Sequence, residues 1–152
     1  MSGFLSFMDL ALDEAQAAGL RREVPVGAVL VQGGVVIARA GNRVRELCDP
    51  TAHAEVLVIR DACRVAGAER LAGADLYVTL EPCAMCAGAI AAARVARLYY
   101  GAADAKSGGV AVGARVFSHP QCHHVPQVYD GIGGAEAEAV LKAFFAARRE
   151  GA

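Results

Sequence analysis

Two short motifs in the sequence carry residues whose types and spacing could do chemistry. The first is HAE at 53–55, and the second, about thirty residues later, is PCAMC at 82–86. An imidazole nitrogen and two thiolates are ligands that zinc prefers, and cysteines three apart on a helix face the same way. We therefore predict that His53, Cys83 and Cys86 bind one zinc ion.

The predicted site leaves room for a reaction. Three protein ligands leave one corner of a tetrahedral zinc site open, which is typical of a catalytic centre, and zinc lowers the pKa of a bound water to about 7. Glu55 lies two residues after His53, about 200° around an ideal helix. We expect it to exchange protons with the water rather than to bind the metal. The order His-x-Glu, then Pro-Cys-x-x-Cys, is typical of zinc-dependent nucleobase deaminases.

The surrounding sequence predicts the elements that position these motifs. Asp49 or Thr51 is expected to cap the helix after the polar loop 41–50, and Pro82 to open the next helix. The alternation of strands and helices implies a mixed sheet covered on both faces. Apolar spacing and turn residues predict helices at 4–20, about 50–65, 82–93 and 135–149, and strands at 25–31, 35–40, 74–80, 95–100 and 125–128.

Composition limits the classes of protein that the chain could represent. Its 152 residues are expected to form a single domain, 1–152. No apolar run approaches the roughly 20 residues that span a bilayer, and the first twenty residues lack the basic start of a signal peptide, so we expect a cytoplasmic protein with no membrane partner. Five cysteines with one Cys-x-x-Cys pair favour metal or redox use over disulfides. A net charge of −1 gives no general sign of a nucleic-acid partner.

Five stretches of the chain resemble the bacterial tRNA adenosine deaminases of the cytidine-deaminase-like superfamily. The resemblance implies an α/β fold, a three-layer α/β/α sandwich with a mixed five-stranded sheet. It also implies a homodimer with one zinc ion per subunit, which converts adenosine to inosine at the wobble position of tRNA anticodons. The stretches are VPVGAVLV (24–31), DPTAHAE (49–55), LYVTLEPCAMCAGAI (76–90), GAADAKSG (101–108) and FFAARR (144–149).

The same resemblance implies roles for residues around the motifs. It makes Glu55 the proton shuttle. Asn42 matches an asparagine that hydrogen-bonds the flipped base, and its amide offers both a donor and an acceptor. Asp104 matches a residue in the loop that holds the target nucleotide. Val26 and Leu80 would be apolar walls of the pocket, or else ordinary core residues of their strands.

Other features concern the RNA. Arg148 and Arg149 on the last helix are candidates for RNA contact, or else part of a solvated face. The chain departs from the tRNA enzymes at two positions, because Ala103 stands where an arginine is common and Gly41 where a bulky aromatic is common. These changes remove one candidate phosphate contact and one packing group.

Two alternatives share the zinc motifs. A small-molecule deaminase acting on guanine, cytosine or a nucleoside such as cytidine would differ in its pocket and rim. A structural zinc protein would bind a partner without catalysis, although the open ligand position and Glu55 argue against it. A further set of metal-binding side chains could form a second site or line the nucleotide path: His119, Cys122, His123 and His124.

Overall fold

The structure, a computed structural model, describes residues 2–151 and the side chains of residues 7–149. It contains one mixed five-stranded sheet with the strand order β2-β1-β3-β4-β5. The neighbours of β1 are antiparallel to it, whereas β3, β4 and β5 run parallel. The strands are β1 (Gly27–Gln32), β2 (Val35–Gly41), β3 (Asp75–Leu80), β4 (Arg97–Ala102) and β5 (Gln127–Tyr129).

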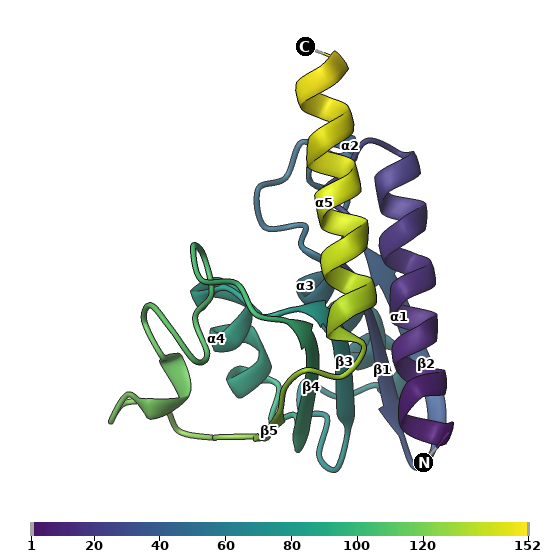
Figure 1. Cartoon of the computed structure of the whole chain (residues 1–152). Helices are drawn as coiled ribbons and strands as arrows, with labels where there is room; N and C mark the ends of the chain where they lie inside the picture. Colours follow the sequence, from purple (N-terminus) through teal and green to yellow (C-terminus); the bar gives the residue numbers. More distant parts are fainter. Residues whose placement is uncertain (1, 152) are drawn as a thin grey trace.

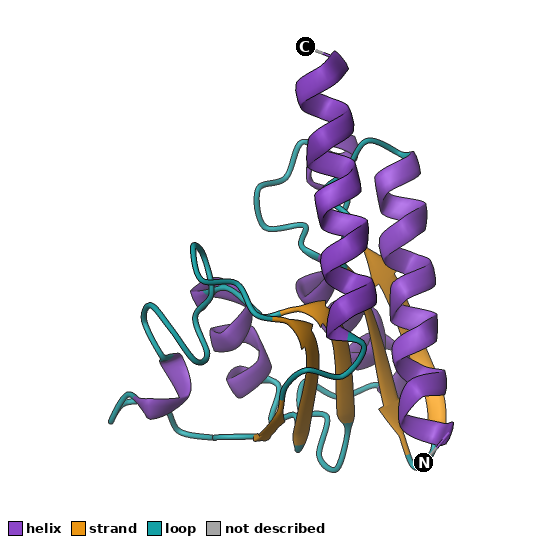
Figure 2. Ribbon diagram, in the orientation of Figure 1, coloured by secondary structure: helices purple, strands orange, loops and turns teal. Residues whose placement is uncertain are grey.

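Helices cover both faces of this sheet (Figure 1). On one face lie α1 (Ser2–Leu20) and α5 (Gly134–Gly151), and on the other lie α3 (Ala54–Ala66) and α4 (Ala84–Ala92). Figure 2 shows the resulting layers, with the end of α5 extending beyond the sheet. The predicted three-layer α/β/α fold is therefore confirmed. Among residues 2–151, no helix combines the length and the apolar character that crossing a membrane requires.

The alternation of side chains along β1 explains why its sequence is apolar throughout. Ala28 and Leu30 are buried in the core beneath α3, whereas Val29 and Val31 are buried in the core beneath α1. Successive side chains of a strand point to opposite faces, so a strand covered on both faces needs apolar residues at every position. The same arrangement buries β3 on both faces, up to the end of the strand just before the Cys-x-x-Cys motif.

The starts of the two site helices were predicted wrongly. Helix α3 begins after His53, its N-cap residue, and not at a cap formed by Asp49 or Thr51. Asp49 Oδ1 instead accepts hydrogen bonds from the backbone N–H and the hydroxyl of Thr51, at 2.8 and 2.7 Å, in a local turn. Helix α4 likewise begins after Cys83 rather than at Pro82.

The connections between elements also differ in detail from the prediction. The polar loop at 41–50 contains a short helix, α2 (Val44–Leu47), whose four residues are too few to show a helical period. The long connection after β4 is irregular as predicted and contains one 3₁₀ turn, η1 (Val116–Ser118).

Gly27 allows α1 and β1 to meet backbone to backbone. A Cβ at this position would lie against the carbonyl oxygen of Ala11 and 2.5 Å from the backbone nitrogen of Ala15. Because backbone atoms cannot rotate away, we expect Gly27→Ala to lower the free energy of unfolding by about 2 kcal/mol or more in urea denaturation. Gly88→Ala is the control: this helical glycine has nothing within 4 Å of the added Cβ, and the change should stabilise the protein by up to about 1 kcal/mol. Equal stabilities of the two variants would contradict the close approach.

Candidate active site

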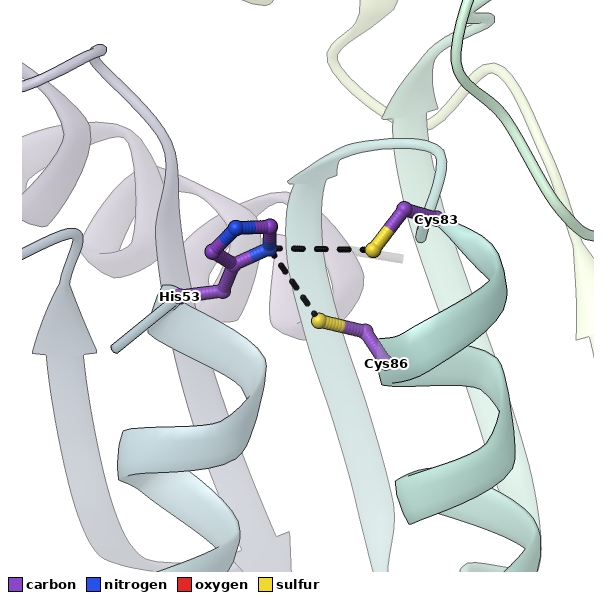
Figure 3. Close-up of side chains that lie close together, drawn as sticks. All are labelled: His53, Cys83 and Cys86. Carbon is purple, nitrogen blue, oxygen red and sulfur yellow. Dashed lines mark hydrogen bonds between the residues drawn. The ribbon is translucent and has the colours of Figure 1, made fainter. Parts of the chain in front are cut away.

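The side chains of His53, Cys83 and Cys86 converge between the N-terminal ends of α3 and α4 (Figure 3). Their ligand atoms all lie within 4.8 Å of one another. His53 Nδ1 is 3.7 Å from Cys83 Sγ and 3.5 Å from Cys86 Sγ. His53 and Cys83 are the N-cap residues of their helices, and Cys86 lies one turn into α4. The structure thus brings together residues that are thirty positions apart in the sequence.

These distances fit a zinc ion. With Zn–S bonds of about 2.3 Å, Zn–N bonds of about 2.0 Å and a tetrahedral angle, nitrogen and sulfur lie about 3.5 Å apart. One imidazole nitrogen and two sulfurs also form a donor set typical of zinc. His53, Cys83 and Cys86 are therefore positioned to bind the metal and leave one tetrahedral corner for another ligand.

The two thiols differ in their ionisation. A hydrogen bond from the Cys86 thiol, together with one from His53, lowers the pKa of Cys83 to about 3. The hydrogen bond to Cys83, together with burial, raises the pKa of Cys86. The hydrogen bond with Cys83 also raises the pKa of His53. Without a metal, the thiolate is therefore favoured at Cys83 and the thiol at Cys86, and helix N-termini favour such a negative charge. A metal that binds both sulfurs as thiolates would displace the remaining proton.

Glu55 lies beside these ligands in the first turn of α3 and is only 3 % exposed. Its Oε1 is buried without a hydrogen-bond partner among the side chains and backbone that the structure describes. Burial raises the pKa of Glu55 to about 7. Leaving a buried polar atom unpaired costs free energy, and such atoms call for a functional explanation. A carboxyl group with this pKa can both accept and release a proton near neutral pH.

A pocket of about 370 Å³ opens onto this site. It brings together most of the residues predicted from the sequence, while Cys86 lies buried and Asp104 and Arg149 are outside its lining. The predicted residues in its wall are Val26, Asn42, His53, Glu55, Leu80, Cys83 and Arg148. Val26 also belongs to the core and Leu80 packs against it, so core residues form the apolar part of this wall.

Asn42 connects the pocket to the helix that carries Glu55. Its Oδ1 accepts a hydrogen bond from the backbone N–H of Ala54 at 2.8 Å, so a side chain from the preceding loop caps α3. The amide oxygen is therefore engaged within the protein. The amide NH2 has no hydrogen bond to the residues that the structure describes, and Asn42 lines the pocket. The sequence suggested that the Asn42 amide could offer a base both a donor and an acceptor. In the structure only the NH2 donor remains available to a base.

The other candidate residues occupy different surroundings. Asp104 Oδ1 accepts hydrogen bonds from the backbone of Lys106 at 3.2 Å and Ser107 at 2.9 Å, so its carboxyl group shapes its own loop. The Arg148 guanidinium lies 5.5 Å from the centre of the Phe144 ring, and Arg148 also lines the pocket. Arg149 is exposed outside the pocket.

The suggested second metal cluster does not form. Cys122 Sγ contacts the carbonyl oxygen of His124 at 3.1 Å, and the His124 ring lies 2.6 Å from the carbonyl oxygen of Val95. Within residues 7–149, the only metal-binding group of three or more His, Cys, Asp or Glu side chains is the one at His53.

Sequence reasoning missed the two acidic residues of the pocket that serve neither the metal nor Glu55, Glu23 and Glu81. Both are buried, and both accept hydrogen bonds from backbone N–H groups more than twenty positions away. Contacts over such separations leave no local spacing to recognise. The only available signal was the acidic residue directly before the Pro-Cys-x-x-Cys motif.

Comparison with known proteins agrees with this site. Residues 1–102 match the family described as "Cytidine and deoxycytidylate deaminase zinc-binding region". The chain is 62 % identical over 143 residues to the tRNA-specific adenosine deaminase of Agrobacterium fabrum. The matched region covers 94 % of each chain.

Solved structures show the same relationship. One, from work on A-to-I editing by tRNA:A34 deaminases at the wobble position of transfer RNA, matches with a TM-score of 0.88 and 63 % identity. The match covers 90 % of this chain and 99 % of that one. A guanine deaminase from Bacillus subtilis is 43 % identical with a TM-score of 0.63, over 64 % of this chain and 63 % of that one. The chain therefore belongs to the zinc-binding cytidine and deoxycytidylate deaminase family and, within it, to the bacterial tRNA-specific adenosine deaminases.

Proposed function

We propose that this chain hydrolytically deaminates adenosine to inosine at the wobble position of tRNA anticodons, using one zinc ion held by His53, Cys83 and Cys86. The observation that carries the proposal is the unpaired carboxyl oxygen of Glu55, buried beside a three-ligand metal site in one pocket. The relative with 62 % identity supports tRNA as the substrate.

The residues of the pocket divide the work of the reaction. When bound, zinc supplies a Lewis acid that activates water at neutral pH. Glu55 takes a proton from the water whose oxygen attacks C6 of adenine and passes it to the ring nitrogen beside C6. It then takes the proton of the new C6 hydroxyl and passes it to the amino group, so that the C–N bond breaks and water and adenosine yield inosine and ammonia. Asn42 donates a hydrogen bond to the base from its free NH2 group. Val26 and Leu80 exclude water from its faces.

Positive side chains at the pocket favour an RNA substrate. Arg22, Arg45 and Arg148 contribute to its wall, where they can contact the phosphates around a flipped nucleotide. We assign Arg149 a more distant phosphate contact. Asp104 shapes the neighbouring loop that holds the nucleotide. These local cations offset the absence of a net positive charge.

The proposal extends to the organisation of the enzyme. Residues 1–152 act as one deaminase domain, the active form is a homodimer with one zinc ion per subunit, and the enzyme works in the cytoplasm, where tRNA is found. The resemblance to the tRNA enzymes supports the dimer. Met85 at the start of α4 is 39 % exposed and offers apolar surface to a second copy.

One experiment tests the substrate assignment. The zinc-loaded protein is incubated with an arginine tRNA carrying adenosine at the wobble position, and separately with free adenosine, cytidine, cytosine and guanine. We expect inosine in the tRNA and no ammonia from the small molecules. Ammonia from guanine or a free nucleoside would favour the small-molecule alternative, and no turnover at all would leave a structural zinc protein. The identity of 62 % over 94 % of the chain to a tRNA-specific adenosine deaminase, against 43 % over 64 % of the chain to the Bacillus subtilis guanine deaminase, makes this alternative the weaker one.

Replacement of the proposed proton shuttle should separate metal binding from catalysis. We expect Glu55→Ala to retain about one zinc ion per chain, measured by elemental analysis, and to lose about 100- to 10,000-fold in kcat. Cys86→Ser is the matched control, because it removes a ligand and should lose both zinc and activity. A Glu55→Ala variant that still converts adenosine to inosine at the wild-type rate would refute the assignment.

A single-atom change at Asn42 should distinguish its two contacts. Asn42→Asp keeps an oxygen for the Ala54 N–H but removes the NH2 donor that faces the pocket. We expect its melting temperature to remain near that of the wild type while kcat/KM on tRNA falls about tenfold or more. Asn42→Ala removes the cap as well. It should lower the free energy of unfolding by about 1 kcal/mol and therefore also the melting temperature. Full activity in Asn42→Asp would exclude the donor role.

A further inference from the structure

Two buried glutamates line the pocket without serving the metal or the proton transfer. Glu23 and Glu81 are each 2 % exposed, and both contribute to the pocket wall. Burying a carboxyl group costs free energy unless its oxygens accept hydrogen bonds. An acidic group beside an RNA-binding pocket also weakens the attraction for phosphates. Their place in the pocket therefore needs a compensating role.

Glu81 holds the loop of residues 104–111. Its Oε1 accepts the backbone N–H of Asp104 at 3.0 Å, and its Oε2 accepts those of Val110 at 3.2 Å and Ala111 at 2.9 Å. A Cβ on Gly108 would lie 2.5 Å from Oε2, so the loop is packed directly against the carboxyl group. One side chain thus joins the segment that carries the metal ligands to the loop that carries Asp104.

Glu23 holds the segment 43–47 through hydrogen bonds to its backbone. Its Oε1 accepts the backbone N–H of Arg45 at 3.1 Å, and its Oε2 accepts that of Glu46 at 2.9 Å. These N–H groups lie in the first turn of α2, where no carbonyl oxygen of the helix can reach them. Val44 and Arg45 of the same segment line the pocket.

We propose that Glu23 and Glu81 are positioning residues, which hold the segment 43–47 and the loop 104–111 in the shape that receives a single-stranded RNA loop. The inference rests on the proposed function. Loops that are already ordered lose less conformational entropy when a ligand binds. The buried hydrogen bonds therefore strengthen RNA binding and leave the chemical step unchanged. Neither carboxyl group transfers a proton.

Glu81→Gln and Glu23→Gln test the structural half of the proposal. Each keeps the size of the side chain but replaces an accepting oxygen with an NH2 group, which cannot accept a backbone N–H. Hydrogen–deuterium exchange of the zinc-loaded protein should become about tenfold faster at 104–111 in Glu81→Gln and at 43–47 in Glu23→Gln. Each variant serves as the control for the other, because its unaffected loop should exchange as in the wild type.

Steady-state kinetics test the functional half. With an anticodon stem-loop RNA that carries adenosine at the wobble position, KM should rise about fivefold or more in both variants, while kcat stays within about twofold. Loss of a negative charge alone would strengthen attraction to RNA and lower KM. Glu138→Gln controls for that effect, because this glutamate on α5 has a side chain that is 61 % exposed. The direction of the KM change therefore separates positioning from simple charge.

The possible outcomes are distinct. An unchanged or lowered KM, or a fall in kcat at constant KM, would overturn the inference. If Glu81→Gln fails to fold, Gly108→Ala replaces it, since the added Cβ would lie 2.5 Å from Glu81 Oε2 and 2.6 Å from the carbonyl oxygen of Asp104, and so forces the loop and the carboxyl group apart. A wild-type KM in that variant would also overturn the inference. If the wild-type protein deaminates no RNA, both the proposed function and the role of the two glutamates in RNA binding are overturned. If the wild-type protein is active and both variants have its KM, only this inference is overturned.

Discussion

The N-terminal ends of two helices have to meet at one point, and the rest of the site depends on that meeting. Two of the three metal ligands are N-cap residues, so a shift in the start of α3 or α4 would move a ligand. The pairing of Ala28 with Val78, and of Leu80 with Ala102, sets the register of the strands that lead into this region. Both helix dipoles direct their positive ends at the sulfurs, which favours the thiolates that a metal needs.

The chemistry of the site could be predicted because its parts are local in the sequence. Cys83 and Cys86 are separated by one helical turn, and His53 and Glu55 are two residues apart. The fold class could be predicted for a related reason, since strands that alternate with helices along the chain imply a sheet covered on both faces. Spacing and periodicity carry this information without any knowledge of tertiary contacts.

Features that depend on distant partners could not be predicted in this way. The cap of α3 comes from Asn42, twelve residues before the bonded amide, so local capping rules pointed to the wrong residues. The burial of Glu23 and Glu81 is invisible to patterns that assign charged residues to the surface. Their partners lie in the short helix α2 and in the irregular loop of residues 104–111, where the sequence shows no periodicity.

The double engagement of Asn42 has a consequence for how the family can diversify. One face of its amide maintains the helix that carries Glu55, and the other faces the pocket. A mutation here that reshapes the pocket also draws on the stability reserve of the whole protein, which is small in natural proteins. Reshaping of the pocket, in nature or in the laboratory, therefore has an easier route through Arg148, which is exposed near the end of α5, than through Asn42.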